Sequence, residues 1–313
     1  MKSAIEQRCC VVQSWKVEQR EPALPSRRSF LQSGLAAAGA SLAVSNRRQC
    51  QAAPSVNRTK LRFGLVTYMW GADWDLPTLL ENCEKTNVLG VELRTEHAHG
   101  VEPSLSKAAR SEVRKRFRDS PVALVGLGSN EDFHEIDQNS LRKSIERAKA
   151  FVELSHDVGG SGVKVKPNDL PPEAPKERTI EQIGRSLNKL AAFADGFGQD
   201  IRLEAHGQCA SLSTMAAILK FADHPRVGLC WNSNPQDLEG AGIDRNFALV
   251  QGRLGKTVHV RKLDGREYPI KRLIQLLAGQ RYNGWILLEA VEEVRDRVAA
   301  LARQRTIFDT LVR

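Results

Sequence analysis

Short apolar runs alternate with longer amphipathic stretches from Leu61 to the end of the chain. The short runs have the length and composition of buried strands, and the longer stretches have the length of helices. An alternating order of strands and helices predicts an α/β fold, in which helices cover a parallel sheet. Eight runs are interpreted as strands: Arg62 to Met69, Gly90 to Arg94, Val122 to Leu127, Gly162 to Lys166, Ile201 to Glu204, Val227 to Trp231, Thr257 to Arg261 and Trp285 to Glu289.

The longer stretches predict the helices between these strands. Several of them open with Ser, Thr or Asp, the residues that cap helix N-termini. Examples are Asp75 to Thr86, Ser140 to Val158, Thr179 to Phe197 and Ser211 to Ala222. Eight strands with eight helices predict a closed (β/α)8 TIM barrel. The alternative is an open doubly wound sheet, but no G-x-G-x-x-G motif follows the first strand, and polar candidates occur at the ends of many strands.

The N-terminal segment has the features of an export signal. Arg27-Arg28-Ser29-Phe30-Leu31 opens an apolar run that continues to Ser45 and is too short to span a bilayer. This pattern is typical of a twin-arginine signal, whereas a core helix would not be followed by the polar linker that comes next. We therefore expect residues 1–55 to be signal peptide and linker, and residues 56–313 to be a single barrel domain. The prediction implies the twin-arginine export machinery as a partner, a periplasmic location, and no stable membrane anchor in the mature form.

Charge and cysteine content exclude several classes of protein. The chain of 313 residues has a net charge of +9, but residues 54–313 hold 38 Lys/Arg against 34 Asp/Glu, which is an ordinary balance. Because no basic run interleaved with aromatic residues occurs there, we expect no nucleic-acid partner. Cys83, Cys209 and Cys230 have no C-x-x-C spacing, which excludes a disulfide framework and a zinc knuckle. One bridge among these three remains open.

Polar residues recur at every second position near the ends of the predicted strands. In a closed parallel barrel, alternate residues point toward the axis, so these side chains are expected to line the mouth formed by the C-terminal strand ends. They are Glu92 and Arg94, Lys164 and Lys166, Arg202, Glu204 and His206, Asn232, His259 and Arg261, and Glu289.

Four of these residues predict a metal site. Glu204, Asn232, His259 and Glu289 stand at the ends of four successive strands. Two carboxylates, an amide oxygen and an imidazole form a mixed oxygen and nitrogen set that suits one divalent ion, such as Mn²⁺, Mg²⁺, Co²⁺ or Zn²⁺. Each residue alone would be an ordinary polar group at a strand end. Their placement on consecutive strands is what favours the metal site.

With these residues in place, the chain resembles the xylose-isomerase-like barrel superfamily of sugar isomerases and epimerases. The resemblance runs from Leu61 to the C-terminus and depends on Gly-Val-Glu-Leu-Arg at residues 90–94 and on Glu204, His259 and Glu289. It implies a metal held by Glu, Asp, His and Glu on strands five to eight. Asn232 departs from that pattern and removes one negative charge, so we expect weaker metal binding or altered selectivity. Lys262 also stands where the family commonly has Asp.

The resemblance implies proton transfer at a carbon next to a carbonyl, through an enediolate stabilised by the metal. Glu204 and Glu289 would then be catalytic acid and base groups as well as ligands. The implied partner is a small-molecule sugar. Candidate substrate contacts, which as packing or surface residues would look the same in sequence, are His206, Arg261, Lys164, Lys166, Glu92, His97, His99, Tyr68 and Trp70.

Three other functions remain open at this point. A related lyase or dehydratase could act on a keto-sugar or inositol through the same enolate chemistry. A hydrolase with several zinc ions, like the apurinic endonuclease branch of the superfamily, would need additional ligands that Gly126-Leu127-Gly128 and Lys164-Val165-Lys166 do not supply. A non-catalytic periplasmic sugar-binding barrel would follow if Asn232 marks the loss of the metal. The sequence also leaves a homo-oligomer open.

Overall fold

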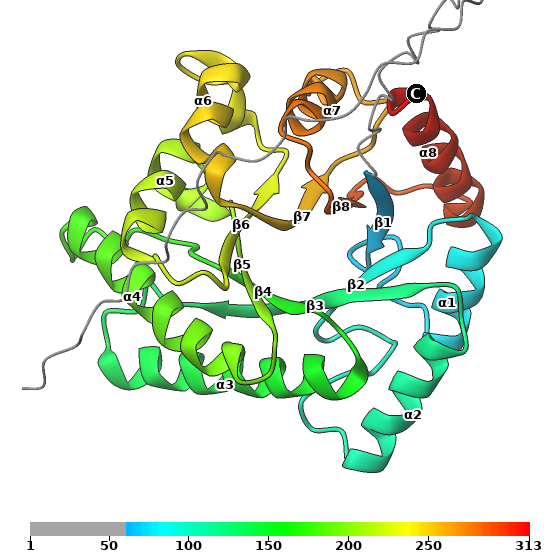
Figure 1. The fold of residues 1–313 in the computed structure, drawn as a ribbon, viewed down its shortest axis with the longest axis horizontal. Coiled ribbons are helices and arrows are strands. Elements are labelled where there is room, and N and C mark those ends of the chain that lie inside the picture. Colours follow the sequence, from blue (N-terminus) through cyan, green and yellow to red (C-terminus); the bar gives the residue numbers. More distant parts are fainter. Residues whose placement is uncertain (1–60) are drawn as a thin grey trace, which may run out of the picture. The chain divides into compact units, whose positions relative to one another are not determined.

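A computed structural model describes residues 61–313, which form a closed barrel of eight parallel strands (Figure 1). The predicted signal segment, residues 1–55, lies outside the described residues. Each strand pairs with its sequence neighbours, and β1 pairs with β8 to close the ring. The strands are β1 (Arg62–Val66), β2 (Gly90–Arg94), β3 (Ala123–Asp132), β4 (Gly162–Lys166), β5 (Asp200–Glu204), β6 (Val227–Asn232), β7 (Leu254–Val260) and β8 (Trp285–Leu288). The predicted (β/α)8 TIM barrel is confirmed.

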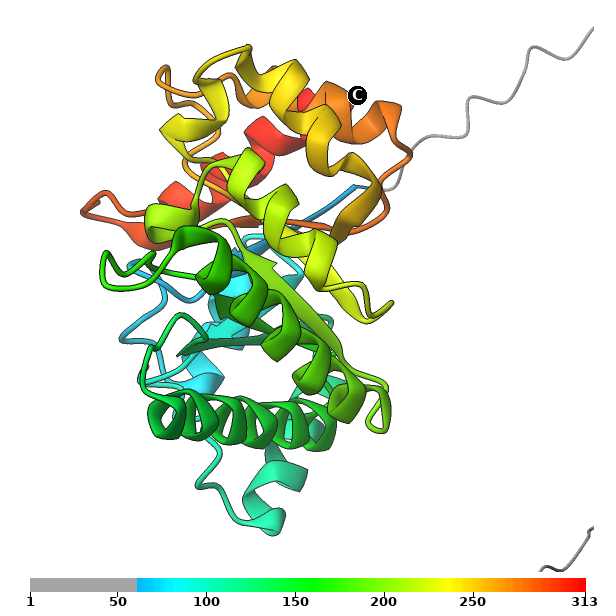
Figure 2. The same cartoon turned by 90° about the vertical axis from the view of Figure 1, so that its left-hand side faces the viewer.

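Helices surround the strands on the outside. Figure 2 shows the green helices α3 and α4 lying across the outer side of the strands. The helices are α1 (Leu76–Lys85), α2 (Lys107–Arg118), α3 (Gln138–Val158), α4 (Lys176–Asp195), α5 (Leu212–Phe221), α6 (Gly242–Val250), α7 (Ile270–Gly279) and α8 (Arg297–Leu311). Two of the predicted caps start their helices: Asp75 accepts a hydrogen bond from the Thr78 amide, and Ser211 accepts one from the Thr214 amide. The other two predicted starts are wrong, because α3 is capped by Asp137 instead of Ser140, and α4 begins before Thr179 without a side-chain cap.

The alternation of polar and apolar residues along the strands places the hydrophobic core between strands and helices. On β4, Val163 and Val165 are fully buried in this outer layer, while Lys164 between them points toward the axis and is also fully buried. The barrel interior is therefore polar near the mouth, and the apolar core surrounds it. This outer layer holds the larger of two apolar clusters, and the smaller one is formed by Val66, Val125, Trp285 and Leu287. Burial of such apolar side chains is the main favourable contribution to folding.

A buried arginine fills the interior toward the N-terminal ends of the strands. Arg202 on β5 donates hydrogen bonds from Nη1 to the carbonyl oxygen of Val125 (3.0 Å) and from Nη2 to Oγ of Ser161 (2.7 Å). Two glycines make room for its guanidinium. A Cβ at Gly126 would lie 2.5 Å from Nη1, and a Cβ at Gly162 would lie 3.1 Å from Cζ. The Arg202 side chain therefore fills the barrel interior below the mouth.

The loops after β1 and β8 are joined at the place where the barrel closes. Trp70, which follows β1, donates from Nε1 to the carbonyl oxygen of Glu292 after β8 (2.8 Å). Arg297 at the start of α8 forms a bidentate ion pair with Asp73, with contacts of 2.6 and 2.9 Å. Phe63 on β1 stacks on Phe308 of α8 with 4.8 Å between the ring centroids. The first and last units of the barrel are therefore held together at the core and at the mouth.

The three cysteines in the described part of the chain, Cys83, Cys209 and Cys230, are buried and free, so no bridge forms among them. Within residues 61–313, none of the helices combines the length and apolar character needed to cross a bilayer.

Candidate active site at the mouth of the barrel

Four polar side chains from successive strands meet at the C-terminal end of the barrel. Glu204 ends β5, Asn232 ends β6, His259 is the penultimate residue of β7, and Glu289 follows β8 directly. Because Asn232 and His259 are paired in register, their side chains leave the sheet at the same height. The parallel order of the strands brings all four residues to one edge, as the sequence predicts.

The distances within this group are short. Asn232 donates from Nδ2 to Glu204 Oε1 (3.0 Å) and to Glu289 Oε2 (3.3 Å). His259 Nδ1 lies 3.4 Å from Glu204 Oε1 and 3.9 Å from Glu289 Oε1. One ligand atom each of Glu204, His259 and Glu289 lies within 4.8 Å of the others, and all three residues are buried. These four residues are called the central cluster below.

The orientation of the Asn232 amide shows how the central cluster fits a metal ion. Its Nδ2 faces the two carboxylates, while its Oδ1 is buried and has no hydrogen-bond partner. Rotation of the amide by half a turn would exchange these two atoms. Three oxygens and the imidazole nitrogen would then face a common point, which is the mixed donor set that suits a divalent ion. The residues present therefore fit one such ion.

Two further buried residues hold the central cluster in place. Lys164 on β4 places Nζ 2.8 Å from Glu204 Oε2. Glu92 on β2 places Oε1 3.1 Å from His259 Nε2. An imidazole whose far nitrogen is held by a carboxylate is fixed in ring orientation, and this arrangement is common behind metal-binding histidines. Glu92 therefore lies behind His259, so that Nδ1 is directed into the central cluster.

The two carboxyl groups of the central cluster have different environments. Burial raises the pKa of Glu204, but the Lys164 ammonium and His259 outweigh this effect and hold the pKa well below its ordinary value. Burial and repulsion from Glu204 raise the pKa of Glu289, and His259, Lys164 and Arg261 only partly offset these effects. Glu204 is thus ionised, while Glu289 retains a proton more readily. Such separation of two carboxyl groups is common where one acts as acid and the other as base.

His259 responds to the same charges. Burial opposes its protonation, yet Cys230 and the carboxylates of Glu92 and Glu204 raise its pKa well above the ordinary value. A protonated imidazole here compensates the buried carboxylates. An incoming divalent ion would require the neutral ring, so metal binding would release this proton.

Four of the predicted substrate contacts lie around the rim of the mouth. Lys166, His206, Arg261 and Tyr68 are each partly exposed. His206 Nδ1 lies 2.9 Å from Asn168 Oδ1, which fixes the ring and leaves Nε2 available. Tyr68 lies under the guanidinium of Arg94, with 5.0 Å from Cζ to the ring centroid.

The other predicted contacts from the loops are engaged within the protein. Both ring nitrogens of His99 are used, with Nε2 2.8 Å from the carbonyl oxygen of Arg94 and Nδ1 accepting from the Val101 amide (3.0 Å). His97 Nδ1 lies 3.2 Å from Thr67 Oγ1. Together with the hydrogen bond from Trp70 to Glu292, these contacts hold the loops after β1 and β2 in place. Lys164 and Glu92, also proposed as substrate contacts, are fully buried beside the central cluster.

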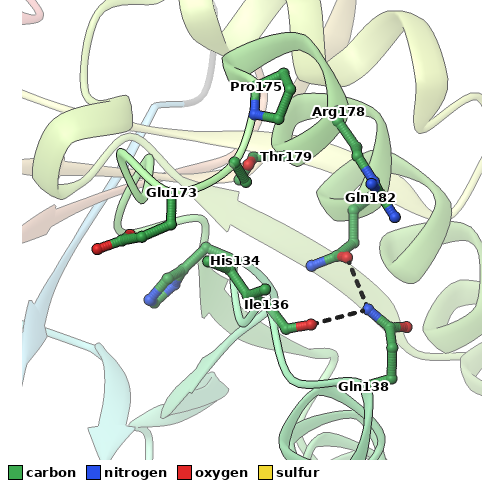
Figure 3. Close-up of a pocket in the computed structure, with 9 residues that line it drawn as sticks. His134, Ile136, Gln138, Glu173, Pro175, Arg178, Thr179 and Gln182 are labelled. Carbon is green, nitrogen blue, oxygen red and sulfur yellow. Dashed lines mark hydrogen bonds between the residues drawn. The ribbon is translucent and has the colours of Figure 1, made fainter.

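Sequence reasoning missed a second polar group, formed by Asp132, His134 and Glu135. Their ligand atoms lie within 4.8 Å of one another, and all three residues are partly exposed. The group follows from the extension of β3 to Asp132, beyond the predicted end at Leu127. The alternation of Asp132 and His134 is the signal that could have revealed it. His134 lines a separate cavity of about 120 Å³, together with residues of the β3–α3 loop, the start of α3, the β4–α4 loop and α4. Figure 3 shows these residues.

The comparisons with known proteins identify the family. Residues 80–307 match the family model described as the xylose isomerase-like TIM barrel. The chain belongs to this xylose isomerase-like TIM barrel family. A search of curated protein sequences finds no match.

Solved structures agree in fold. The chain is 14% identical to the apo form of 3-keto-D-glucoside 4-epimerase from E. coli, with a TM-score of 0.67 over 80% of this chain and 100% of that one. It is 16% identical to an L-ribulose 3-epimerase, with a TM-score of 0.70 over 80% and 94% of the two chains. The IOLI protein with a bound zinc atom is also 16% identical, with a TM-score of 0.68 over 80% and 98%. These likenesses establish the barrel architecture.

Proposed function

We propose that this protein is a sugar isomerase or epimerase that depends on one divalent metal ion and moves a proton at a carbon next to a carbonyl. The observation that carries the proposal is the central cluster of Glu204, Asn232, His259 and Glu289. Within it, the pKa of the Glu204 carboxyl is lowered and that of the Glu289 carboxyl is raised. Family membership supports it, and so do the epimerases among the structures of the same fold.

The central cluster provides two groups for proton transfer. Glu204 ends β5 and Glu289 follows β8, and because these strands are not neighbours in the barrel, the two carboxyl groups approach the mouth from different sides. One can remove a proton from one face of a substrate and the other can return a proton to the opposite face. Lys164 holds Oε2 of Glu204 and thereby orients the carboxylate.

The remaining chemistry belongs to the metal and its ligands. A divalent ion held by the central cluster would supply the electrophile that stabilises negative charge on a substrate oxygen. Glu92 fixes the ring of His259 for this role. The buried position of these groups excludes bulk water, which strengthens each electrostatic interaction.

Hydrogen exchange tests this function directly. The protein, supplied with Mn²⁺, is incubated in deuterated water with a panel of ketoses, aldoses and keto-inositols, and deuterium uptake next to the carbonyl is followed. We expect uptake with the substrate, and loss by a factor of about 100 or more in Glu204→Gln and in Glu289→Gln, because each variant lacks one proton-transfer group. Glu293→Gln, which changes an exposed glutamate four residues after Glu289, is the matched control and should exchange normally.

Other outcomes separate the competing functions. Unchanged exchange in both active-site variants would refute the assigned roles. Sugar binding without exchange would favour the binding barrel, and loss of water from the substrate would favour the lyase. Chelation followed by return of Mn²⁺ should abolish and restore exchange, and chelator-resistant exchange would refute metal dependence.

We also propose that the protein is exported to the periplasm. The proposal rests on the sequence around Arg27 and Arg28, because the signal segment lies outside the described residues. The Arg27→Lys/Arg28→Lys double variant should keep the precursor in the cytoplasm, as seen by fractionation. The Arg47→Lys/Arg48→Lys variant, with the same change in the linker, should be exported normally. Equal export of both variants would exclude the twin-arginine route.

A further inference from the structure

A divalent ion would leave the central cluster and its surroundings with a positive charge. Glu92, Glu204 and Glu289 contribute three buried carboxylates, and Lys164 and Arg202 contribute two buried cations. Without the ion, a protonated His259 brings the net charge of this interior to zero. With a divalent ion bound and His259 neutral, the net charge is +1. With the ion bound, the interior therefore has no negative charge left over to compensate additional cations near the mouth.

Two more cations form the next layer toward the mouth. Arg94 stands two residues beyond Glu92 on β2, and Lys166 stands two residues beyond Lys164 on β4. Because residues two apart in a strand point to the same side, both side chains are directed toward the barrel axis. Between these strands, β3 presents Gly128, which has no side chain. A Cβ at Gly128 would lie 3.2 Å from Arg94 Cγ, 3.2 Å from Glu92 Oε1 and 3.4 Å from Lys164 Cε. The glycine therefore makes room for Arg94 beside Glu92 and Lys164, and Lys166 lies farther along β4, paired with Asp132.

These two cations lack full compensation by the protein. Lys166 is partly buried, and within residues 61–313 no carboxylate forms an ion pair with its ammonium. Burial, together with the nearby charges of Lys164 and Arg94, lowers the pKa of Lys166, and the carboxylates of Glu204 and Asp132 offset this effect only in part. Asp132 is paired with Lys166 across β3 and β4, but its carboxylate interacts with His134 Nδ1 (3.4 Å) and Asn168 Nδ2 (3.2 Å).

Arg94 also has unused hydrogen-bonding capacity. Its Nη2 donates to Asn130 Oδ1 (2.8 Å), but its Nε is buried and has no hydrogen-bond partner. A guanidinium recognises carboxylates and phosphates well because its donors match two anionic oxygens at once. Repulsion between neighbouring cations in a partly buried site falls when an anion lies between them.

We propose that the substrate of this barrel carries an anionic group, a carboxylate or a phosphate, which Arg94 and Lys166 bind at the mouth. The proposal rests on the proposed function and narrows its substrate class to sugar acids or sugar phosphates. Neutral sugars lack the group that these two cations recognise.

Binding measurements with matched probes test this inference without requiring turnover. Calorimetry with D-glucuronate, D-glucose 6-phosphate and D-glucose compares one ring with a carboxylate, a phosphate or neither. We expect one anionic probe to bind at least about tenfold more tightly than glucose, since a charged hydrogen bond contributes that much or more. Whichever probe binds better identifies the kind of anion.

Variants assign the preference to the two cations. Lys166→Gln and Arg94→Gln should each reduce the preference for the anionic probe by about tenfold, while Lys166→Arg should retain most of it. Lys256→Gln removes an exposed lysine near the opposite end of the barrel and should leave the preference unchanged. Circular dichroism confirms folding of each variant.

The outcomes are distinct from those of the exchange experiment. Equal binding of all three probes, absence of binding by both anionic probes, or a preference that survives in Lys166→Gln and Arg94→Gln would overturn the inference. A preference for the anion without deuterium uptake would instead refute the proposed proton transfer and leave the anion site standing.

Discussion

Asn232 gives the central cluster its distinctive chemistry at the scale of single residues. Its amide donates to both carboxylates, so one neutral side chain relieves the repulsion between Glu204 and Glu289. A carboxylate at this position would have no hydrogen to donate and would add a third negative charge. The amide therefore favours the ion-free state and lowers the attraction for a metal ion.

Asn232→Asp should destabilise the ion-free protein and strengthen its binding of a metal ion. We expect the free energy of unfolding in chelator to fall by about 2 kcal/mol, because two charge-assisted hydrogen bonds are lost. Affinity for Mn²⁺ should increase on the order of tenfold, because the site gains a negative ligand. Urea denaturation and calorimetry measure the two quantities. Asn283→Asp, an exposed change near the N-terminal end of β8, is the control. Unchanged metal affinity in Asn232→Asp would count against Asn232 as a ligand.

At the scale of elements, glycines set how closely the strands and their side chains pack. Gly90 at the start of β2 faces the indole of Trp285 at the start of β8. A Cβ on Gly90 would lie 2.2 Å from Trp285 Cζ3, well inside contact distance. The buried ring of Trp285 thus occupies the volume that a side chain on β2 would need.

Gly90→Ala should destabilise the barrel by about 1–3 kcal/mol, because the added methyl group displaces the indole from its place. Urea denaturation measures the change in the free energy of unfolding. Gly279→Ala provides the matched comparison, since a Cβ there would meet no atom within 4 Å, and its effect should stay within about 0.5 kcal/mol. Equal effects of the two substitutions would show that the indole accommodates the methyl group.

Hydrophobic patterning predicts the strands but not all of their ends. The bounds of β2 and β4 agree with prediction because apolar residues alternate there with inward polar ones. β3 continues through Ser129 and Asn130 to Asp132, and no apolar run indicates this polar extension. β1 ends at Val66 because the chain turns after Thr67, although Tyr68 and Met69 continue the apolar pattern.

Strand parity also explains how much of the site the sequence could predict. It anticipates the convergence of the central cluster, since parallel strands present their C-terminal ends together. It does not distinguish a residue at the rim from one held behind the site. Glu92 and His99 were both predicted to contact substrate, but Glu92 lies behind His259, and both ring nitrogens of His99 hold its own loop. Those assignments depend on distances that only the folded chain supplies.

At the scale of the whole molecule, a buried carboxyl group outside the central cluster links stability to pH. Asp237, after β6, is fully buried and accepts a hydrogen bond from the Tyr268 hydroxyl (2.6 Å). Burial raises the pKa of Asp237 from 3.8 to about 7, although Tyr268, Asn234 and Trp231 act in the opposite direction. Between these two values the folded protein retains a proton that the unfolded chain has released. Stability therefore falls as pH rises through this range and levels off above the folded-state pKa.

Asp237→Asn should remove this dependence. We expect the wild-type free energy of unfolding to fall by about 2 kcal/mol more than that of the variant between pH 5 and pH 7, because the amide does not titrate. Denaturation at both pH values measures the difference. Asp119→Asn, at an exposed helix end, should keep the wild-type pH dependence. The same dependence in Asp237→Asn and the wild type would mean that Asp237 is ionised throughout.

The pairing of β1 with β8 also governs when the barrel can close. The first strand lacks its second neighbour until residues 285–288 have left the ribosome, and Phe63 lacks its stacking partner until Phe308 has followed. Nearly the whole chain must therefore be translated before a native ring exists. Twin-arginine translocation accepts folded cargo, so on the proposed route export would begin only after synthesis is complete. A nascent or truncated chain would carry the signal but could not be exported, because its barrel could not close.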